Sequence, residues 1–133
     1  MLGELKVVGE DAKLSWQGLI PGASRLEDVI ARLGAPSDKG TLTNGDYYEF
    51  DKGAVIVFFL NQSNLLSKLR ITSYVSQPGT LPQSIIEARE YFGPLTETRI
   101  DKLEGAIFER PGVRVACDTF GDPALVRWIE LYV

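Results

Sequence analysis

The sequence contains no histidine and a single cysteine, and these two shortages exclude several kinds of chemistry. Without histidine, the chain cannot carry a Ser-His or Cys-His nucleophile pair. With Cys117 alone, it can form neither an internal disulfide nor a cysteine-rich metal site. Cys117 follows Val113 and Val115 in an alternating pattern, which is typical of a buried, unreactive thiol. Catalytic arrangements are therefore scarce in this sequence, and we expect a protein that is not an enzyme.

Basic runs and long apolar runs are also missing. The formal net charge is −4 and the lysines and arginines do not cluster, so we expect no nucleic-acid groove. The longest apolar run, Ala54 to Leu60, is too short to cross a bilayer, so we expect no membrane insertion. No signal peptide is recognisable. As it stands the sequence fits the cytoplasm, whereas a leader removed beforehand would place the protein in the cell envelope or outside the cell.

Two short helix patterns are present, and each is followed by glycine and proline. The first has apolar residues at i, i+3, i+4 and i+7, namely Leu26, Val29, Ile30 and Leu33. Ser24 with Glu27 fits a capping box at its start. Gly34, in a left-handed cap, and Pro36 mark its end. The sequence therefore predicts a helix over residues 25–33.

The second pattern lies 59 residues later, which is the distance from Gly34 to Gly93. It predicts a helix over residues 81–92. A capping box fits at Thr80 and another fits at Ser84. We prefer Thr80, because Pro82 then falls in the first turn, where its missing N–H costs little.

The segments that follow the two helices are also similar. Two β-rich runs surround a turn at residues 51–53 and again at residues 110–112. A further strand begins at Ile71 and, in the second copy, at Ile129. A period near 59 residues in helix, turn and strand indicates a duplication. We predict an α+β fold of two tandem repeats, each a helix packed on a three- to four-stranded antiparallel sheet.

The predicted repeats share a core, because a unit of about 60 residues is barely stable alone. The first repeat, with an N-terminal arm of short strands, covers residues 1–77, and the second covers residues 78–133. The strand over residues 54–60 is apolar on both alternations, which predicts burial on both faces. The strands of the second repeat alternate, so we expect them to keep one face toward water.

The stretch LIPGASRLEDVIARLGAP, followed by YYEF and AVIVFF, resembles the SmpA/OmlA (BamE-like) family of small bacterial envelope proteins. In that family a Pro-Gly-small-Ser/Thr helix start and a Leu-Gly-x-Pro stop precede an antiparallel sheet. A tandem pair of such units is similar to the arrangement in β-lactamase inhibitory proteins. The resemblance implies α+β layers, no enzyme activity, no cofactor and a protein partner. This chain lacks the disulfides of the inhibitory proteins and the lipid-attachment cysteine of the envelope lipoproteins.

The last strand carries the candidate binding residues. Trp128 and Tyr132 alternate with apolar residues and share one strand face with Glu130. Arg114 joins them from the neighbouring strand. Because mixed aromatic and charged surfaces are typical of protein-binding sites, we predict that these four residues bind a protein partner. The alternative for Trp128 is a core position under the N-terminal arm, against Trp16.

A second hypothesis is a carrier of a small apolar ligand, or an enzyme, with its site in a crevice between the repeats. The expected lining of that crevice is aromatic: Phe58, Phe59 and Phe92. Three acidic residues could be imagined as a hard-metal or acid–base group: Asp46, Glu49 and Asp51. Acids beside turns are usually solvated, so we expect no metal site. We favour the protein-binding module, and a homo-oligomer is compatible with it.

Overall fold

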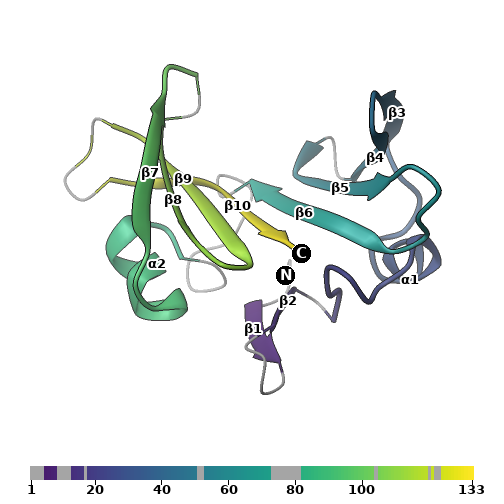
Figure 1. The fold of residues 1–133 in the computed structure, drawn as a ribbon, viewed down its shortest axis with the longest axis horizontal. Helices are drawn as coiled ribbons and strands as arrows, with labels where there is room; N and C mark the ends of the chain where they lie inside the picture. Colours follow the sequence, from purple (N-terminus) through teal and green to yellow (C-terminus); the bar gives the residue numbers. More distant parts are fainter. Residues whose placement is uncertain are drawn as a thin grey trace.

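The computed structural model describes residues 5–8, 13–16, 18–50, 53–72, 82–103, 105–119, 121 and 124–133. Eight strands form one antiparallel sheet in the order β3-β4-β5-β6-β10-β9-β8-β7 (Figure 1). They are β3 (Asp38–Leu42), β4 (Gly45–Phe50), β5 (Val55–Leu60), β6 (Leu66–Thr72), β7 (Thr96–Asp101), β8 (Gly105–Arg110), β9 (Val113–Cys117) and β10 (Val126–Tyr132). The helices among the described residues are α1 (Leu26–Leu33) and α2 (Ile85–Phe92).

The predicted α+β fold of two tandem helix-on-sheet repeats is wrong. The chain is mostly one continuous sheet with two short helices, because β6 and β10 pair directly from Trp128↔Thr72 to Tyr132↔Lys68. In Figure 1, β3–β6 lie on one side and β7–β10 on the other, and β6 and β10 meet between them. Each of these strands would otherwise leave a row of backbone N–H and C=O groups unpaired, so joining them satisfies both edges. The division into residues 1–77 and 78–133 falls among undescribed residues and stays a prediction.

The first helix is confirmed, but its cap is one residue later than expected. Arg25 is the N-cap, and its backbone N–H donates to the Asp28 carboxylate at 2.8 Å. The Ser24 hydroxyl instead accepts from the Ile20 N–H at 2.8 Å, which fixes the loop before the helix. At the other end Gly34 adopts a φ of 86°, as a glycine stop requires.

The second helix is four residues shorter than predicted. It begins after Ser84, whose hydroxyl accepts from the Glu87 N–H at 3.2 Å, while the Glu87 carboxylate accepts from the Gln83 N–H at 2.7 Å. The N-cap is thus Ser84, the second of the two predicted positions, although the Glu87 carboxylate bonds the N–H of Gln83 rather than that of Ser84 as in a reciprocal capping box. Thr80 lies outside the described residues. The preference for Thr80 was therefore wrong.

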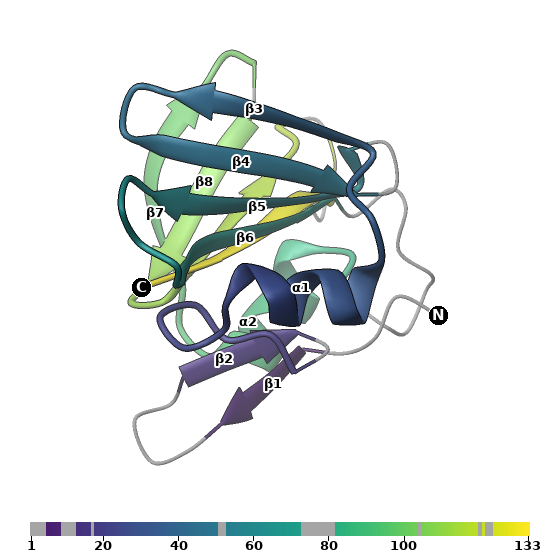
Figure 2. The ribbon, with the colours of Figure 1, turned by 90° about the vertical axis from the view of Figure 1, so that its right-hand side faces the viewer.

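The two helices lie on the same side of the sheet, and the main hydrophobic core lies between them and the strands (Figure 2). Val29 of α1 and Ala88 and Phe92 of α2 are buried there. The separate ribbon of β1 (Leu5–Val8) and β2 (Lys13–Trp16) lies below the helices, away from the sheet. The N-terminal arm thus supplies strands, as expected, and Trp16 joins the main core.

We call the other side of the eight-stranded sheet the outer face. Because alternate residues of a strand point to opposite sides, the outer face includes Tyr47, Glu49, Ile56, Phe58, Lys68, Arg70, Ile107, Glu109, Arg114, Ala116, Trp128, Glu130 and Tyr132. The expected difference in burial between its two halves is wrong, because both halves are partly exposed; in the second half Arg114 and Tyr132 reach solvent. Ile56 and Phe58 of β5 are half-buried, whereas Ile107 of β8 and Ala116 of β9 are fully buried.

Candidate binding face

All four residues predicted to bind a partner lie on the outer face, and the structure brings them together. Glu130 of β10 lies directly opposite Arg114 of β9. Trp128 and Tyr132 stand two residues before and after Glu130, on the same side of the strand. The shared face that the alternating sequence predicts is therefore present.

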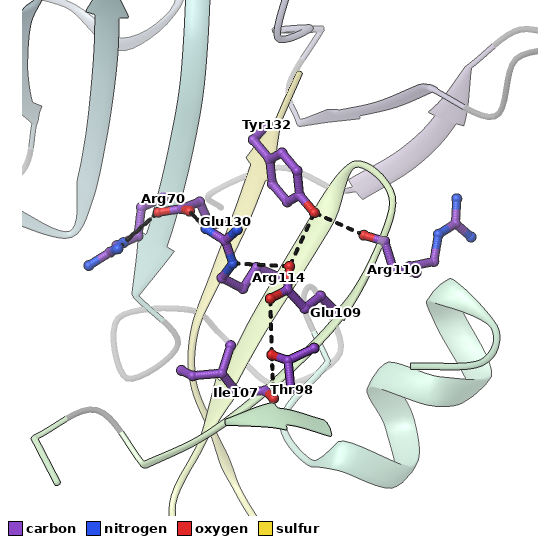
Figure 3. A network of polar contacts seen from close by, with 8 residues as sticks. All are labelled: Arg70, Thr98, Ile107, Glu109, Arg110, Arg114, Glu130 and Tyr132. Atoms are coloured by element: carbon purple, nitrogen blue, oxygen red, sulfur yellow. Dashed lines mark hydrogen bonds and ion pairs between the residues drawn. The ribbon is translucent and has the colours of Figure 1, made fainter. Parts of the chain in front are cut away.

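Glu130 is the centre of an ion-pair network. Its side chain is 0% exposed, and its Oε2 accepts from Nε and Nη2 of Arg70 at 3.0 and 2.9 Å. Its Oε1 accepts from Nη1 of Arg114 at 2.8 Å (Figure 3). The three residues face one another across β6, β10 and β9. A buried carboxylate is tolerated only when it is paired in this way, so the two arginines make the burial of Glu130 possible.

Arg70 is the functional candidate that sequence reasoning missed. The alternation within β6 places Arg70 on the side opposite Leu69 and Ile71, but it does not say which strand lies beside it. Its partner Glu130 is 60 residues away in the chain. No local pattern reports such a pairing, although an arginine flanked by two apolar strand residues was a usable signal.

The network continues to Glu109 on β8. Nε of Arg114 lies 3.3 Å from a Glu109 oxygen, and the Thr98 hydroxyl donates to the carboxylate at 3.0 Å. The Tyr132 hydroxyl lies 3.3 Å from the same carboxylate and 3.2 Å from the Arg110 carbonyl oxygen (Figure 3). Burial alone would raise the pKa of Glu109, but the Thr98 hydrogen bond and the charge of Arg114 outweigh it and lower that pKa. Glu109 is therefore a carboxylate at neutral pH.

Cations of the outer face also stack on aromatic rings. The guanidinium of Arg70 lies 4.2 Å from the centre of the Trp128 ring, and that of Arg114 lies 4.8 Å from the centre of the Tyr132 ring. Such contacts add a further attraction to each guanidinium and fix its plane. Burial and the charge of Glu109 together raise the pKa of Tyr132, so its hydroxyl stays protonated at neutral pH.

Trp128 is buried, but its surroundings differ from both predictions. The side chain is 7% exposed and packs in a small cluster with Ile107 and Ala116 on the outer face. Trp16 belongs to the main core on the helix side, so the two indoles do not pack against each other. Trp128 therefore offers little surface to a partner, and its ring instead supports the guanidinium of Arg70.

The aromatic surface of this face continues on the first half of the sheet. Tyr47 and Phe58 are half-buried neighbours, with ring centres 6.5 Å apart. Lys68 extends over the Phe58 ring, 5.1 Å from its centre. Phe59 and Phe92, in contrast, belong to the main core. The three phenylalanines of the carrier hypothesis therefore lie on two different sides of the sheet and do not line one crevice.

The remaining candidate groups do not form a reactive site in the described structure. Asp46 and Glu49 point to opposite sides of β4, and Asp51 lies outside the described residues. Within those residues no three His, Cys, Asp or Glu side chains lie close enough to hold a metal ion. Burial raises the pKa of the Cys117 thiol to about 12, which keeps it protonated and confirms the predicted buried cysteine.

Comparisons with known proteins give a likeness of fold. No protein-family model and no curated protein matches the chain. The crystal structure of a DUF4309 family protein (YjgB) from Bacillus subtilis is similar, with a TM-score of 0.53 and 14% sequence identity over 92% of this chain and 89% of that one. At this identity the likeness concerns the fold alone, and the resemblance to the SmpA/OmlA family stays a prediction. In the described part of the chain, neither helix is long and apolar enough to cross a membrane.

Proposed function

We propose that this protein is a non-enzymatic binding module that docks another protein on the outer face of its sheet. The observation that carries the proposal is the pair Arg70 and Arg114, held side by side by the buried Glu130. Arginine and tyrosine are among the residues most enriched at binding hot spots, and both types meet here. The face also exposes parts of Phe58 and Tyr132 next to these charges.

The geometry favours binding because the side chains are already ordered. A free arginine loses about 2 kcal/mol of rotamer entropy when a partner immobilises it. Glu130 and the rings of Trp128 and Tyr132 hold both guanidiniums before any partner arrives. Much of this rotamer entropy is therefore already lost when the chain folds, and binding loses less. Tyr132, rather than Trp128, is the accessible ring beside them, so it replaces Trp128 as the expected anchor.

The test is capture of partners from a native lysate by the immobilised protein, followed by mass spectrometry. The immobilised Tyr132→Ala variant should no longer capture the partner, whereas the Tyr91→Ala variant should capture it as the wild type does. Tyr91 is the matched control, because it is an exposed tyrosine on α2, on the other side of the sheet. Both variants are first compared with the wild type by thermal melting. A partner lost equally in both variants, or in neither, would contradict docking on the outer face.

A further inference from the structure

The centre of the outer face presents positive charge, although the whole chain carries a net charge of −4. On the three central strands, the described outward positions hold the cations Lys68, Arg70 and Arg114 and one acid, Glu130. The Glu130 side chain is 0% exposed, while those of Arg70 and Arg114 are 26% and 28% exposed. A molecule that approaches these strands therefore meets guanidinium and ammonium groups before it meets the carboxylate.

Acidic residues limit this cationic area on both sides. Glu49 lies on the outer face of β4, and Glu109 lies on β8, where it pairs with Arg114. The area is thus about three strands wide, or roughly 10 Å between the outer strands. Nucleic acids and other polyanions need a longer track of cations, and a protein of net charge −4 repels them at a distance. The size and charge fit one or two carboxylates with apolar neighbours.

We propose that the protein partner presents an acidic segment, whose carboxylate binds over Arg114, Arg70 and Lys68. This inference rests on the proposed protein-binding function and specifies its partner. Apolar side chains next to that carboxylate pack on Phe58, beside Lys68, and on Tyr132, which lies between Lys68 and Arg114. Glu130 is a positioning residue, because it is covered by the two guanidiniums and holds them in place rather than touching the partner.

The probes are two fluorescein-labelled synthetic peptides and one single-stranded oligonucleotide of similar length. The first peptide alternates glutamate with leucine, and the second has glutamine at every glutamate position. Fluorescence anisotropy should show the glutamate peptide binding at least about tenfold more tightly than the glutamine peptide, since charged hydrogen bonds to arginine are lost in the latter. Binding should weaken as salt is added, because the cations are partly exposed.

Variants test which residues carry the binding. Lys68→Gln should weaken binding of the glutamate peptide several-fold, and Arg114→Gln should weaken it by about tenfold. The matched control is Arg32→Gln, which removes an exposed arginine from α1 and should leave binding unchanged. Equal affinity for the two peptides, or equal losses in the Arg114 and Arg32 variants, would overturn the inference.

The variant Glu130→Gln tests whether Glu130 acts by positioning the two guanidiniums or only through its effect on the charge that attracts the peptide. The substitution makes the outer face more positive, so charge attraction alone predicts tighter binding of the glutamate peptide. Positioning predicts binding weakened by about threefold or more, because the guanidiniums lose their shared anchor. Tighter binding would overturn the positioning role. If this variant does not fold, the Arg114, Lys68 and Arg32 variants decide the inference.

Two further outcomes keep the inference separate from the function on which it rests. If the oligonucleotide binds as tightly as the glutamate peptide and depends equally on Arg114, the face is a polyanion site and the inference fails. Suppose instead that a captured partner requires Tyr132 for binding and yet is not displaced by the glutamate peptide, with its binding unchanged by Arg114→Gln. In that case the proposed acidic specificity is wrong, while the proposed protein-binding function stands. Displacement of such a partner by the glutamate peptide supports both.

Discussion

Removal of the Glu130 carboxylate should destabilise the folded protein by about 3 kcal/mol. Glu130→Ala deletes three hydrogen bonds, of 2.8 to 3.0 Å, to two charged guanidiniums. Loss of one partner from a buried ion pair costs about 3–5 kcal/mol, mainly because the remaining charge is left buried. Arg70 and Arg114 are each about a quarter exposed and can turn partly toward water, so the lower end of that range applies.

Thermal unfolding is a convenient assay for this effect. A 133-residue domain has an unfolding entropy of roughly 0.28 kcal/mol per kelvin near its midpoint, from about 2.1 cal/mol per kelvin for each residue. A loss of about 3 kcal/mol therefore lowers the Tm by about 10 °C. Circular dichroism at neutral pH measures this shift, and denaturant unfolding measures the free energy independently.

Two further variants show whether the cost comes from unpaired charge. Glu90→Ala removes an exposed carboxylate from α2 and should change the Tm by less than about 2 °C. The triple variant Arg70→Met, Glu130→Leu, Arg114→Met removes the buried carboxylate together with both guanidiniums and should recover much of the stability. Glu109 loses Arg114 in this variant, but it is about a quarter exposed and keeps its contact with Thr98. The reasoning is refuted if Glu130→Ala melts with the wild type, or if the triple variant is no more stable than Glu130→Ala.

Two other predictions concern stability. Gly105→Ala should cost at least about 3 kcal/mol, because Gly105 has a φ of 91° and an added Cβ would lie 2.1 Å from the Cys117 carbonyl oxygen. Gly34→Ala, with a similar φ of 86° and open space around it, should cost only about 1.5 kcal/mol; equal costs in denaturant unfolding would contradict the steric argument. Because the folded pKa of Glu109 is below the ordinary value of 4.5, its contribution is present above pH 4.5 and is lost as the pH falls through the folded pKa. Glu109→Gln should therefore flatten the fall in Tm between neutral pH and about pH 3, and an unchanged slope would contradict this.

The sequence alone predicted those features whose signals are local. Each helix has its own apolar stripe and a glycine at its end, and both helices are present. Two predicted hairpins, β4 with β5 and β8 with β9, have apolar and β-branched residues on either side of a short turn. All four of these strands are present. Caps were less predictable, because several Ser, Thr and acidic residues near each helix start fit the same hydrogen bonds.

The missed strands lack the signal on which strand prediction depends. In β3 and β7 nearly every side chain is exposed, so their sequences, DKGTL and TETRID, show no apolar alternation. Both are edge strands, for which polar side chains on either side are ordinary. The strand predicted from Ile71 begins earlier, at Leu66, because Lys68 and Arg70 hide its alternation.

The pairing of β6 with β10 determined both the wrong fold prediction and the missed arginine. It joins residues 60 positions apart, so neither periodicity nor spacing could reveal it. Without this pairing the sheet separates into two halves, and Glu130 has one arginine instead of two. The burial of the outer face around Trp128 and Glu130 also depends on it, since β6 supplies the guanidinium that covers the indole.

The same ion pairs also favour one alignment of β6 against β10. Successive residues of a strand point to opposite sides, so a slip of one residue in β10 would turn Glu130 toward the main core and Ile129 toward the outer face. Such a slip would bury a carboxylate without Arg70 and Arg114 and would expose an apolar residue in exchange. In the observed register, Ile129 packs in the core while Glu130 meets both arginines. The alignment that satisfies the core therefore also places two guanidiniums together on the outer face, and the candidate site and the centre of the sheet depend on the same contacts.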